Sequence, residues 1–272
     1  MFTSFCTGVL SLRSLSLSLA TTRTRAWALA PVAILALIGV VSGQSITVPG
    51  ASVGQNLETS ITISVSPVAP VGGLSLKVTS SDPSKLLVAG RQIDLGTQQT
   101  TFVIPGGEST ISGIYLQGLV SSGTVTITAS APGYQSGMAT ITLTPSGFLM
   151  TGPGGATLTT NVGAAKSTLT LTSARLDSSF NFAENQPVRG GFSTSVDVTN
   201  TNPSAGAVAT PVSFAGGDAI ATTLFTPGSI GSTTLTAVAP VGFSTPLSGN
   251  SVAVTVNPAT LTPSTVTLGK NL

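Results

Sequence analysis

The sequence contains no histidine, and its single cysteine, Cys6, lies close to the N-terminus. Ser-His-Asp and Cys-His catalytic arrangements and the usual zinc sites therefore lack the residues that they require. Charged residues make up only 7% of the chain, and no two acidic residues stand close enough for a calcium loop of the Asp-x-Asp-x-Asp-Gly type. The sequence thus predicts no enzyme activity, no catalytic residue, no cofactor and no metal site.

Long apolar runs are equally scarce, and the one that stands out lies at 26–41. Arg23 and Arg25 precede it, and it ends in the small-residue segment Val-Ser-Gly at 41–43. A transmembrane helix needs about 20 apolar residues, so this shorter run predicts an export signal over residues 1–43, cleaved near Gly43. The alternative is an uncleaved N-terminal anchor, which would be the only contact of the chain with a membrane.

Removal of residues 1–43 changes the charge balance of the chain. Three of the ten basic residues, Arg13, Arg23 and Arg25, leave with the leader, so seven remain against eight acidic residues and the net charge becomes −1. The basic isoelectric point of 9.0 is therefore a property of the leader. A nucleic-acid partner is therefore not expected. The export signal predicts a secreted or cell-surface location.

What the sequence does contain is an internal repeat. The segment Gly-Thr-Val-Thr-Ile-Thr-Ala-Ser-Ala-Pro at 123–132 returns as Gly-Ser-Thr-Thr-Leu-Thr-Ala-Val-Ala-Pro at 231–240. Apolar residues alternate with threonine in these copies, which is the period of a strand with one buried face. Four further blocks match in the same order, with starting pairs at 53 and 162, 76 and 196, 102 and 212, and 141 and 254. The chain is therefore predicted to hold two copies of one all-β unit.

Each copy carries short alternating segments separated by Gly, Pro, Asn or Asp turns, which is typical of an antiparallel β-sandwich. The predicted domains are 44–146 and 147–258, followed at 259–272 by the start of a truncated third repeat. The segment 146–155 is interpreted as the join, or else residues 148–150 begin the second unit. The expected core residues are Ile61, Ile63, Leu76, Val78, Ile104, Val125, Ile127, Leu169, Leu171, Val196, Val198, Phe214 and Leu235.

Two kinds of motif carry a family resemblance. The first is the repeated strand with its Pro-Gly-Tyr or Pro-x-Gly-Phe turn. The second is the pair of turns Thr-Ser-Ser-Asp-Pro-Ser at 79–84 and Thr-Asn-Thr-Asn-Pro-Ser at 199–204. They resemble the tandem bacterial immunoglobulin-like domains of exported surface proteins such as the invasin and intimin group. The resemblance implies tandem immunoglobulin-like sandwiches and a spacer or adhesion role. No cysteine pair or core tryptophan of the antibody type accompanies it, since Trp27 lies in the leader.

Two functions follow as hypotheses. The first is a non-enzymatic structural or adhesive array at the bacterial surface, with a surface protein or glycan as partner and neighbouring immunoglobulin-like repeats in the same chain. The second is an accessory region of a larger exported enzyme, such as a hydrolase that acts on polysaccharide. Asp82, Glu108 and Asp218 lie in matched turns, where turn capping is favoured over a calcium site at a domain junction.

The two copies differ most between their matched strands at 66–73 and 174–193, where the second copy is 12 residues longer. Exposed loops at one end of a sandwich often carry binding residues, and arginine with aromatic residues is typical of contact hot spots. The candidate contact residues in this extension are Arg175, Phe180, Phe182, Glu184 and Arg189. The alternative interpretation is an added edge strand that packs on its own sheet.

Overall fold

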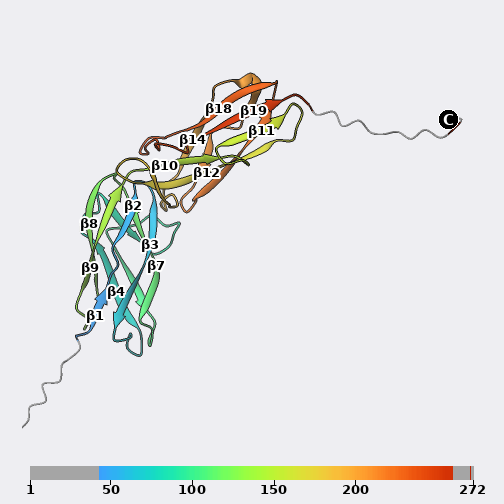
Figure 1. The fold of residues 1–272 in the computed structure, drawn as a ribbon. Coiled ribbons are helices and arrows are strands. Elements are labelled where there is room, and N and C mark those ends of the chain that lie inside the picture. The colour runs from blue at the N-terminus through green and yellow to red at the C-terminus, as the bar shows by residue number, and fades with distance from the viewer. Residues whose placement is uncertain (1–42, 260–269, 271–272) are drawn as a thin grey trace, which may run out of the picture. The chain divides into compact units, whose positions relative to one another are not determined.

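The computed structural model describes residues 43–259 and Lys270, and the regular secondary structure of this part consists almost entirely of β-strands (Figure 1). The only helix in this described part is the short 3-10 turn η1, Pro203–Ala205. The predicted all-β class is therefore confirmed. The predicted leader lies outside the described residues except for Gly43, and the truncated third repeat lies outside them except for Ala259 and Lys270. Both therefore stay predictions.

The first half of the chain forms two sheets that face each other. One has the strand order β1-β3-β7-β5 and the other has the order β2-β9-β8-β4-β6. The strands are β1 Ser45–Thr47, β2 Ala51–Gly54, β3 Glu58–Ser66, β4 Leu74–Ser80, β5 Leu86–Ala89, β6 Gln99–Ile104, β7 Thr110–Gly118, β8 Gly123–Ser130 and β9 Gly137–Thr144.

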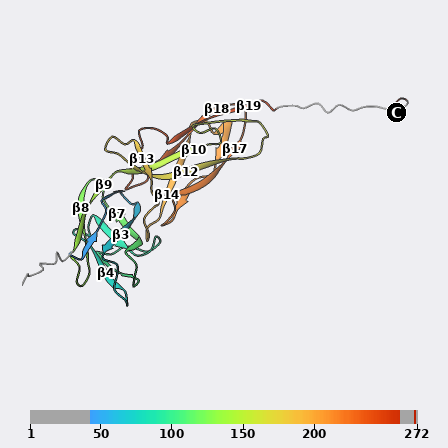
Figure 2. The same cartoon turned by 60° about the horizontal axis from the view of Figure 1, so that its bottom comes forward.

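The second half repeats this arrangement with the orders β10-β12-β17-β15 and β11-β19-β18-β14-β16. One strand, β13, has no counterpart in the first half and pairs with β12 (Figure 2). The strands are β10 Ser146–Thr151, β11 Thr157–Asn161, β12 Ser167–Leu176, β13 Phe182–Asn185, β14 Thr194–Asn200, β15 Gly206–Val208, β16 Val212–Phe214, β17 Ile220–Pro227, β18 Gly231–Val238 and β19 Ser251–Asn257.

Among the strands of residues 43–259, the pairing is antiparallel with one exception in each half. Strand β2 runs parallel to β9, and β11 runs parallel to β19. The sequence predicted antiparallel sandwiches, and these two short strands differ because each crosses from one sheet to the edge of the other after the first strand of its half. The two halves therefore also share this parallel crossing strand.

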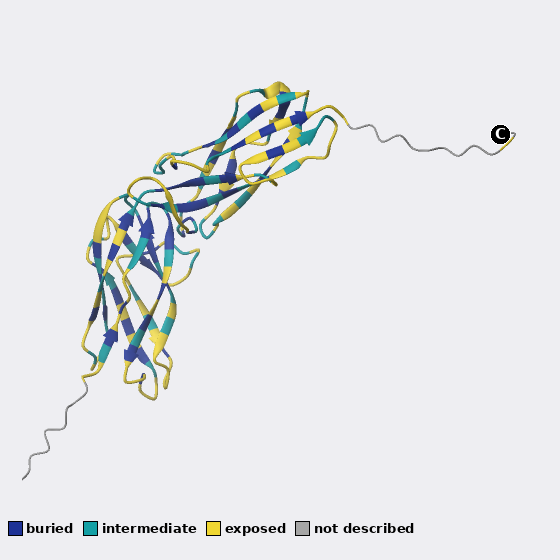
Figure 3. Ribbon diagram, in the orientation of Figure 1, coloured by how far each residue is buried: buried dark blue, intermediate teal, exposed yellow. Residues whose placement is uncertain are grey.

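Alternation along the strands builds two hydrophobic cores, and Figure 3 shows the buried bands. In β8, Val125, Ile127 and Ala129 are buried and the threonines between them are not. All thirteen core residues predicted from the sequence are buried. Threonine serves the outer positions because its β-branched side chain favours the extended backbone.

The segment 146–155 is not a linker. Residues 146–151 form β10, which pairs with β12 along its whole length, and Gly152 and Gly155 close a tight turn through backbone hydrogen bonds of 2.7 and 3.0 Å. The alternative interpretation, in which residues 148–150 begin the second unit, is the one that the structure shows. The described residues belong to one compact unit, in which Pro145 alone separates β9 from β10.

Candidate functional site

The two cores meet at a junction formed by the turn 54–58 and the segment 186–191. The backbone N–H of Glu58 donates to the carbonyl of Pro187 at 3.0 Å, and the N–H of Arg189 donates to the carbonyl of Asn56 at 3.0 Å. Leu57, which belongs to the first repeat, is fully buried in the core of the second. The junction is therefore a packed interface with paired backbone groups.

The amide of Gln186 joins the two halves through both of its polar atoms. Its Oε1 accepts from the N–H of Gly54 at 3.0 Å, and its Nε2 donates to the carbonyl of Ser52 at 2.9 Å. Gln186 is buried, so both atoms would lose solvation without these partners. The Gln186 side chain, which belongs to the second half of the chain, thus pairs with backbone groups at the edge strand β2 of the first half.

Glu58 is the acidic residue at the centre of the junction, and its side chain is fully buried. Its Oε2 accepts from Gln117 Nε2 at 3.1 Å and from the N–H of Gly190 at 2.9 Å. Its Oε1 has no hydrogen-bond partner within the described part of the chain. Burial raises the pKa of Glu58 to about 7, although both hydrogen bonds and the charge of Arg189 act in the opposite direction.

Arg189 lies on the other side of this junction. Its guanidinium carbon is 4.7 Å from the centre of the Phe192 ring, and its Nε is buried without a partner among residues 43–259. Burial lowers the pKa of Arg189, and the charge of Glu58 opposes this shift. Arg189 therefore packs against Phe192 and interacts electrostatically with Glu58, and it does not project as a free contact residue.

At Gly190 the backbone of the second half packs closely against the backbone of the loop at 92–94 in the first half. A Cβ atom at this position would lie 2.3 Å from the carbonyl oxygen of Asp94 and 2.6 Å from that of Gln92. The next residue, Gly191, donates its N–H to the carbonyl of Ile93 at 3.2 Å and has a φ of +69°. Glycine is required at both positions, because a side chain would push away the loop between β5 and β6.

The turn between β12 and β13 presents Phe180. Asp177 organises it: its Oδ1 accepts from the N–H groups of Ser179 and Asn181 at 2.8 and 2.9 Å, and these bonds hold its pKa below the ordinary value. The backbone of Phe180 has a φ of +63°, which is rare for a bulky residue. The Phe180 carbonyl accepts from the N–H of Leu247 at 2.9 Å, while the side chain stays 43% exposed.

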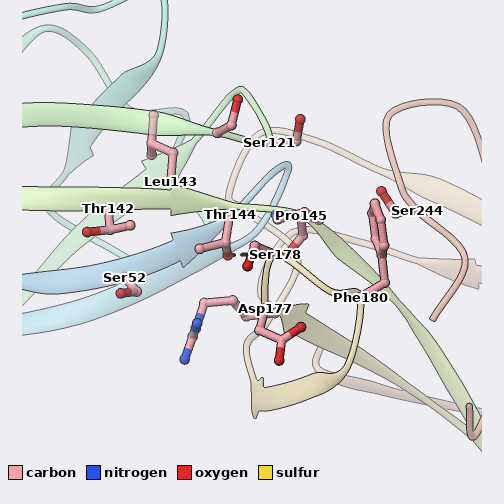
Figure 4. A pocket seen from close by; sticks show the side chains of 12 residues that line it. Ser52, Ser121, Thr142, Leu143, Thr144, Pro145, Asp177, Ser178, Phe180 and Ser244 are labelled. Atoms are coloured by element: carbon pink, nitrogen blue, oxygen red, sulfur yellow. Dashed lines mark hydrogen bonds between the residues drawn. The ribbon is translucent and has the colours of Figure 1, made fainter. Parts of the chain in front are cut away.

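Beside this turn lies a groove of about 610 Å³, shown in Figure 4 and called the junction groove below. One wall consists of β2, β9 and the loop after β7, and the other consists of the Phe180 turn and Ser244. The lining residues are Ser52, Ser121, Ser122, Thr142, Leu143, Thr144, Pro145, Arg175, Asp177, Ser178, Phe180 and Ser244. A volume of this size lies within the range of about 300–1,000 Å³ that is usual for ligand sites.

The structure divides the five candidate contact residues instead of bringing them to one surface. Arg175 and Phe180 line the junction groove, and Arg175 Nε lies 3.4 Å from Glu184 Oε2. Phe182 is 52% exposed on β13, away from the groove lining, and Arg189 is held in the junction. Part of the extension is thus the added edge strand of the alternative interpretation, and its turn is a wall of the groove.

Sequence reasoning missed Glu58, Gln186 and the hydroxyl groups of β2 and β9. A signal for Glu58 was present, because the repeat has Leu-Glu at 57–58 where the second copy has Lys-Ser at 166–167. Glu58 thus carries a charge at the start of a matched strand where the second copy has an uncharged serine. Nothing comparable marks Gln186, whose partners Gly54 and Ser52 in the first half lie 132 and 134 residues away.

Two of the three acidic residues in the matched turns, Asp82 and Asp218, cap those turns. Asp82 Oδ1 accepts from the N–H of Ser84 at 3.1 Å, and Asp218 Oδ2 accepts from the N–H of Ala215 at 2.8 Å. Within residues 43–259 there is no cluster of three or more acidic, histidine or cysteine side chains that could hold a metal ion.

None of the helical structure in the described residues is long and apolar enough to cross a membrane.

Comparison with known proteins gives matches among solved structures alone. No family model matches the sequence, and no curated protein matches it. Domains 5–6 of the S-layer protein SbsC match at 15% identity and a TM-score of 0.30, covering 80% of this chain and 97% of that one. The D00-D0 domain of intimin matches at 15% identity and a TM-score of 0.30, covering 78% of this chain and 98% of that one.

The adhesin InvE of Yersinia pseudotuberculosis matches at 17% identity and a TM-score of 0.28, over 79% of this chain. The match spans 59% of that structure. These three matches are bacterial surface proteins, which is the class that the sequence resembles. At these identities and scores, the matches carry no conclusion about function.

Proposed function

We propose that this chain is a non-enzymatic, adhesive immunoglobulin-like segment of an exported bacterial surface or secreted protein. Its two domains would be residues 44–146 and 147–258, joined directly through the junction. The observation that carries the proposal is the junction itself, where Gly54, Glu58 and Gln186 link the two sandwiches through buried hydrogen bonds. Such a junction holds the two domains in one fixed geometry, which a binding surface shared by both of them requires.

The chemistry of the chain supports a binding role. Residues 44–258 contain no histidine or cysteine, and the buried acid, Glu58, is enclosed by its own hydrogen bonds and an arginine. Asp177, the acid that lines the junction groove, is held by backbone N–H groups. A general acid or base must be reached by the substrate, whereas Glu58 is fully buried and Asp177 is held in its turn by backbone N–H groups, which supports binding over catalysis.

The location is inferred from the N-terminal sequence. Arginines, an apolar run and a small-residue end favour export with removal of residues 1–43. A mature chain without cysteine holds together by core packing alone, which two cores of this size provide.

Deletion of the gene in the bacterium that carries it tests this function. We expect antibody against the chain to label intact wild-type cells or their medium, and we expect the deletion strain to attach less to host cells or matrix. Restoring the gene should restore attachment. Labelling only after permeabilisation, or unchanged attachment with loss of growth on a polysaccharide, would contradict the proposal, and the second result would favour the accessory region of an enzyme.

A further inference from the structure

We propose that the junction groove binds an uncharged oligosaccharide, with the ring of Phe180 as the stacking surface and the hydroxyl groups of β2 and β9 as its polar wall. This inference rests on the proposed adhesive function and names the class of its ligand. It depends on the geometry of the groove, on the free polar groups that line it and on the charge balance around Arg175.

The backbone presents Phe180 in an uncommon way. A large aromatic side chain in a left-handed backbone conformation is costly, and such conformations cluster at functional sites. Here the turn is held by Asp177 and by the hydrogen bond from Leu247, and it points the ring toward Ser244 (Figure 4). The ring has no aromatic partner among the described residues. An exposed ring face held in place can stack on the C–H groups of a sugar ring.

The groove also has unused hydrogen-bonding capacity. The hydroxyl groups of Ser52, Ser121 and Thr142 on the wall opposite Phe180, and that of Ser178 in the turn, make no hydrogen bond to another group in residues 43–259. A hydroxyl group both donates and accepts, as the hydroxyl groups of a sugar do. The groove thus combines one apolar face with several matching polar groups.

The charge of the groove decides between ligand classes. Arg175 is paired with Glu184, and Asp177 keeps its charge within the turn. The positive charge of the lining is therefore balanced, so a nucleotide or an acidic sugar has no excess of cations to bind. A lipid would need a continuous apolar lining, which Leu143, Pro145 and Phe180 alone do not supply.

The test uses the purified full chain and an array of neutral, sialylated and sulfated oligosaccharides, followed by titration calorimetry with the neutral sugar that gives the strongest signal. We expect binding to neutral sugars. Phe180→Asn should weaken it by at least about tenfold, because asparagine keeps the left-handed turn but lacks the ring. Thr142→Val should weaken it by about threefold or more, because it removes one hydroxyl group without changing the shape.

Phe182→Thr is the matched control, because it removes a ring that is at least as exposed as that of Phe180 but does not line the groove. It should leave the affinity unchanged, and all three variants should melt close to the wild-type temperature. Binding to no sugar, preference for acidic sugars, or equal binding by Phe180→Asn at an unchanged melting temperature would overturn the inference. If wild-type cells still attach in any of these cases, the proposed adhesive function stands and only the ligand class is wrong.

Discussion

Glu58 makes the stability of the protein depend on pH in an unusual direction. Its pKa is raised from 4.5 in the unfolded chain to about 7 in the folded protein. The folded state therefore binds this proton more tightly, so the contribution is fully present below pH 4.5 and is lost as the pH rises through about 7. At about 1.4 kcal/mol for each pH unit, the loss amounts to at most about 3.5 kcal/mol.

The substitution Glu58→Gln isolates this effect. The glutamine Oε1 can accept the bonds that Gln117 and Gly190 donate to Glu58, and the side chain cannot ionise. At pH 8 the variant should be more stable than the wild type by about 1–2 kcal/mol, whereas at pH 4.5 the two should be similar. The assay is urea unfolding of the full chain, followed by circular dichroism between about pH 4.5 and pH 8.5.

A second variant locates the cause in the junction. Arg189→Gln removes the positive charge that lowers the pKa of Glu58, so the loss of stability should begin at the same pH but continue to a higher pH than in the wild type. Asp82 and Asp177 do not interfere, because their pKa values are lowered and their contributions are lost only in more acidic solution. Equal pH profiles for the wild type and Glu58→Gln between about pH 5 and pH 8 would refute this reasoning.

The close approach at Gly190, the core and the leader can each be tested separately. Gly190→Ala should lower the free energy of unfolding by about 1–3 kcal/mol, whereas Gly90→Ala, whose Cβ would lie 3.7 Å from Phe102, should change it little; equal effects in urea unfolding would contradict the close approach at Gly190. Ile127→Ala should cost about 2–4 kcal/mol in the same assay because Ile127 is fully buried, and a change below about 0.5 kcal/mol would not fit a core position. N-terminal sequencing of exported protein should begin near residue 44, and a mature chain that starts at Met1 would exclude cleavage.

The cores could be predicted from the sequence because each depends on local alternation. Val125 and Ile127 are separated by one residue, so their shared burial follows from the period of a strand. Because the strand is repeated, the same burial could be predicted for Leu235 in the second copy, and Leu235 is buried.

The junction could not be predicted, because it depends on residues far apart in the chain. Gln186 and Ser52 are 134 residues apart, and no local pattern relates a glutamine to a distant backbone carbonyl. The length of the extension at 174–193 did indicate a special region. Its division into β13, a left-handed turn and a junction segment depends on pairing with β12 and on the close approach at Gly190.

An adhesive, non-enzymatic chain should attach reversibly to a surface without changing it chemically. Equilibrium binding of the labelled full chain to intact host cells tests this, with release of the bound protein after dilution and analysis of the medium for cleaved products. We expect saturable, reversible binding and no product that accumulates with time. An absence of saturable binding, or the steady release of cleaved sugar or peptide, would contradict the proposed function.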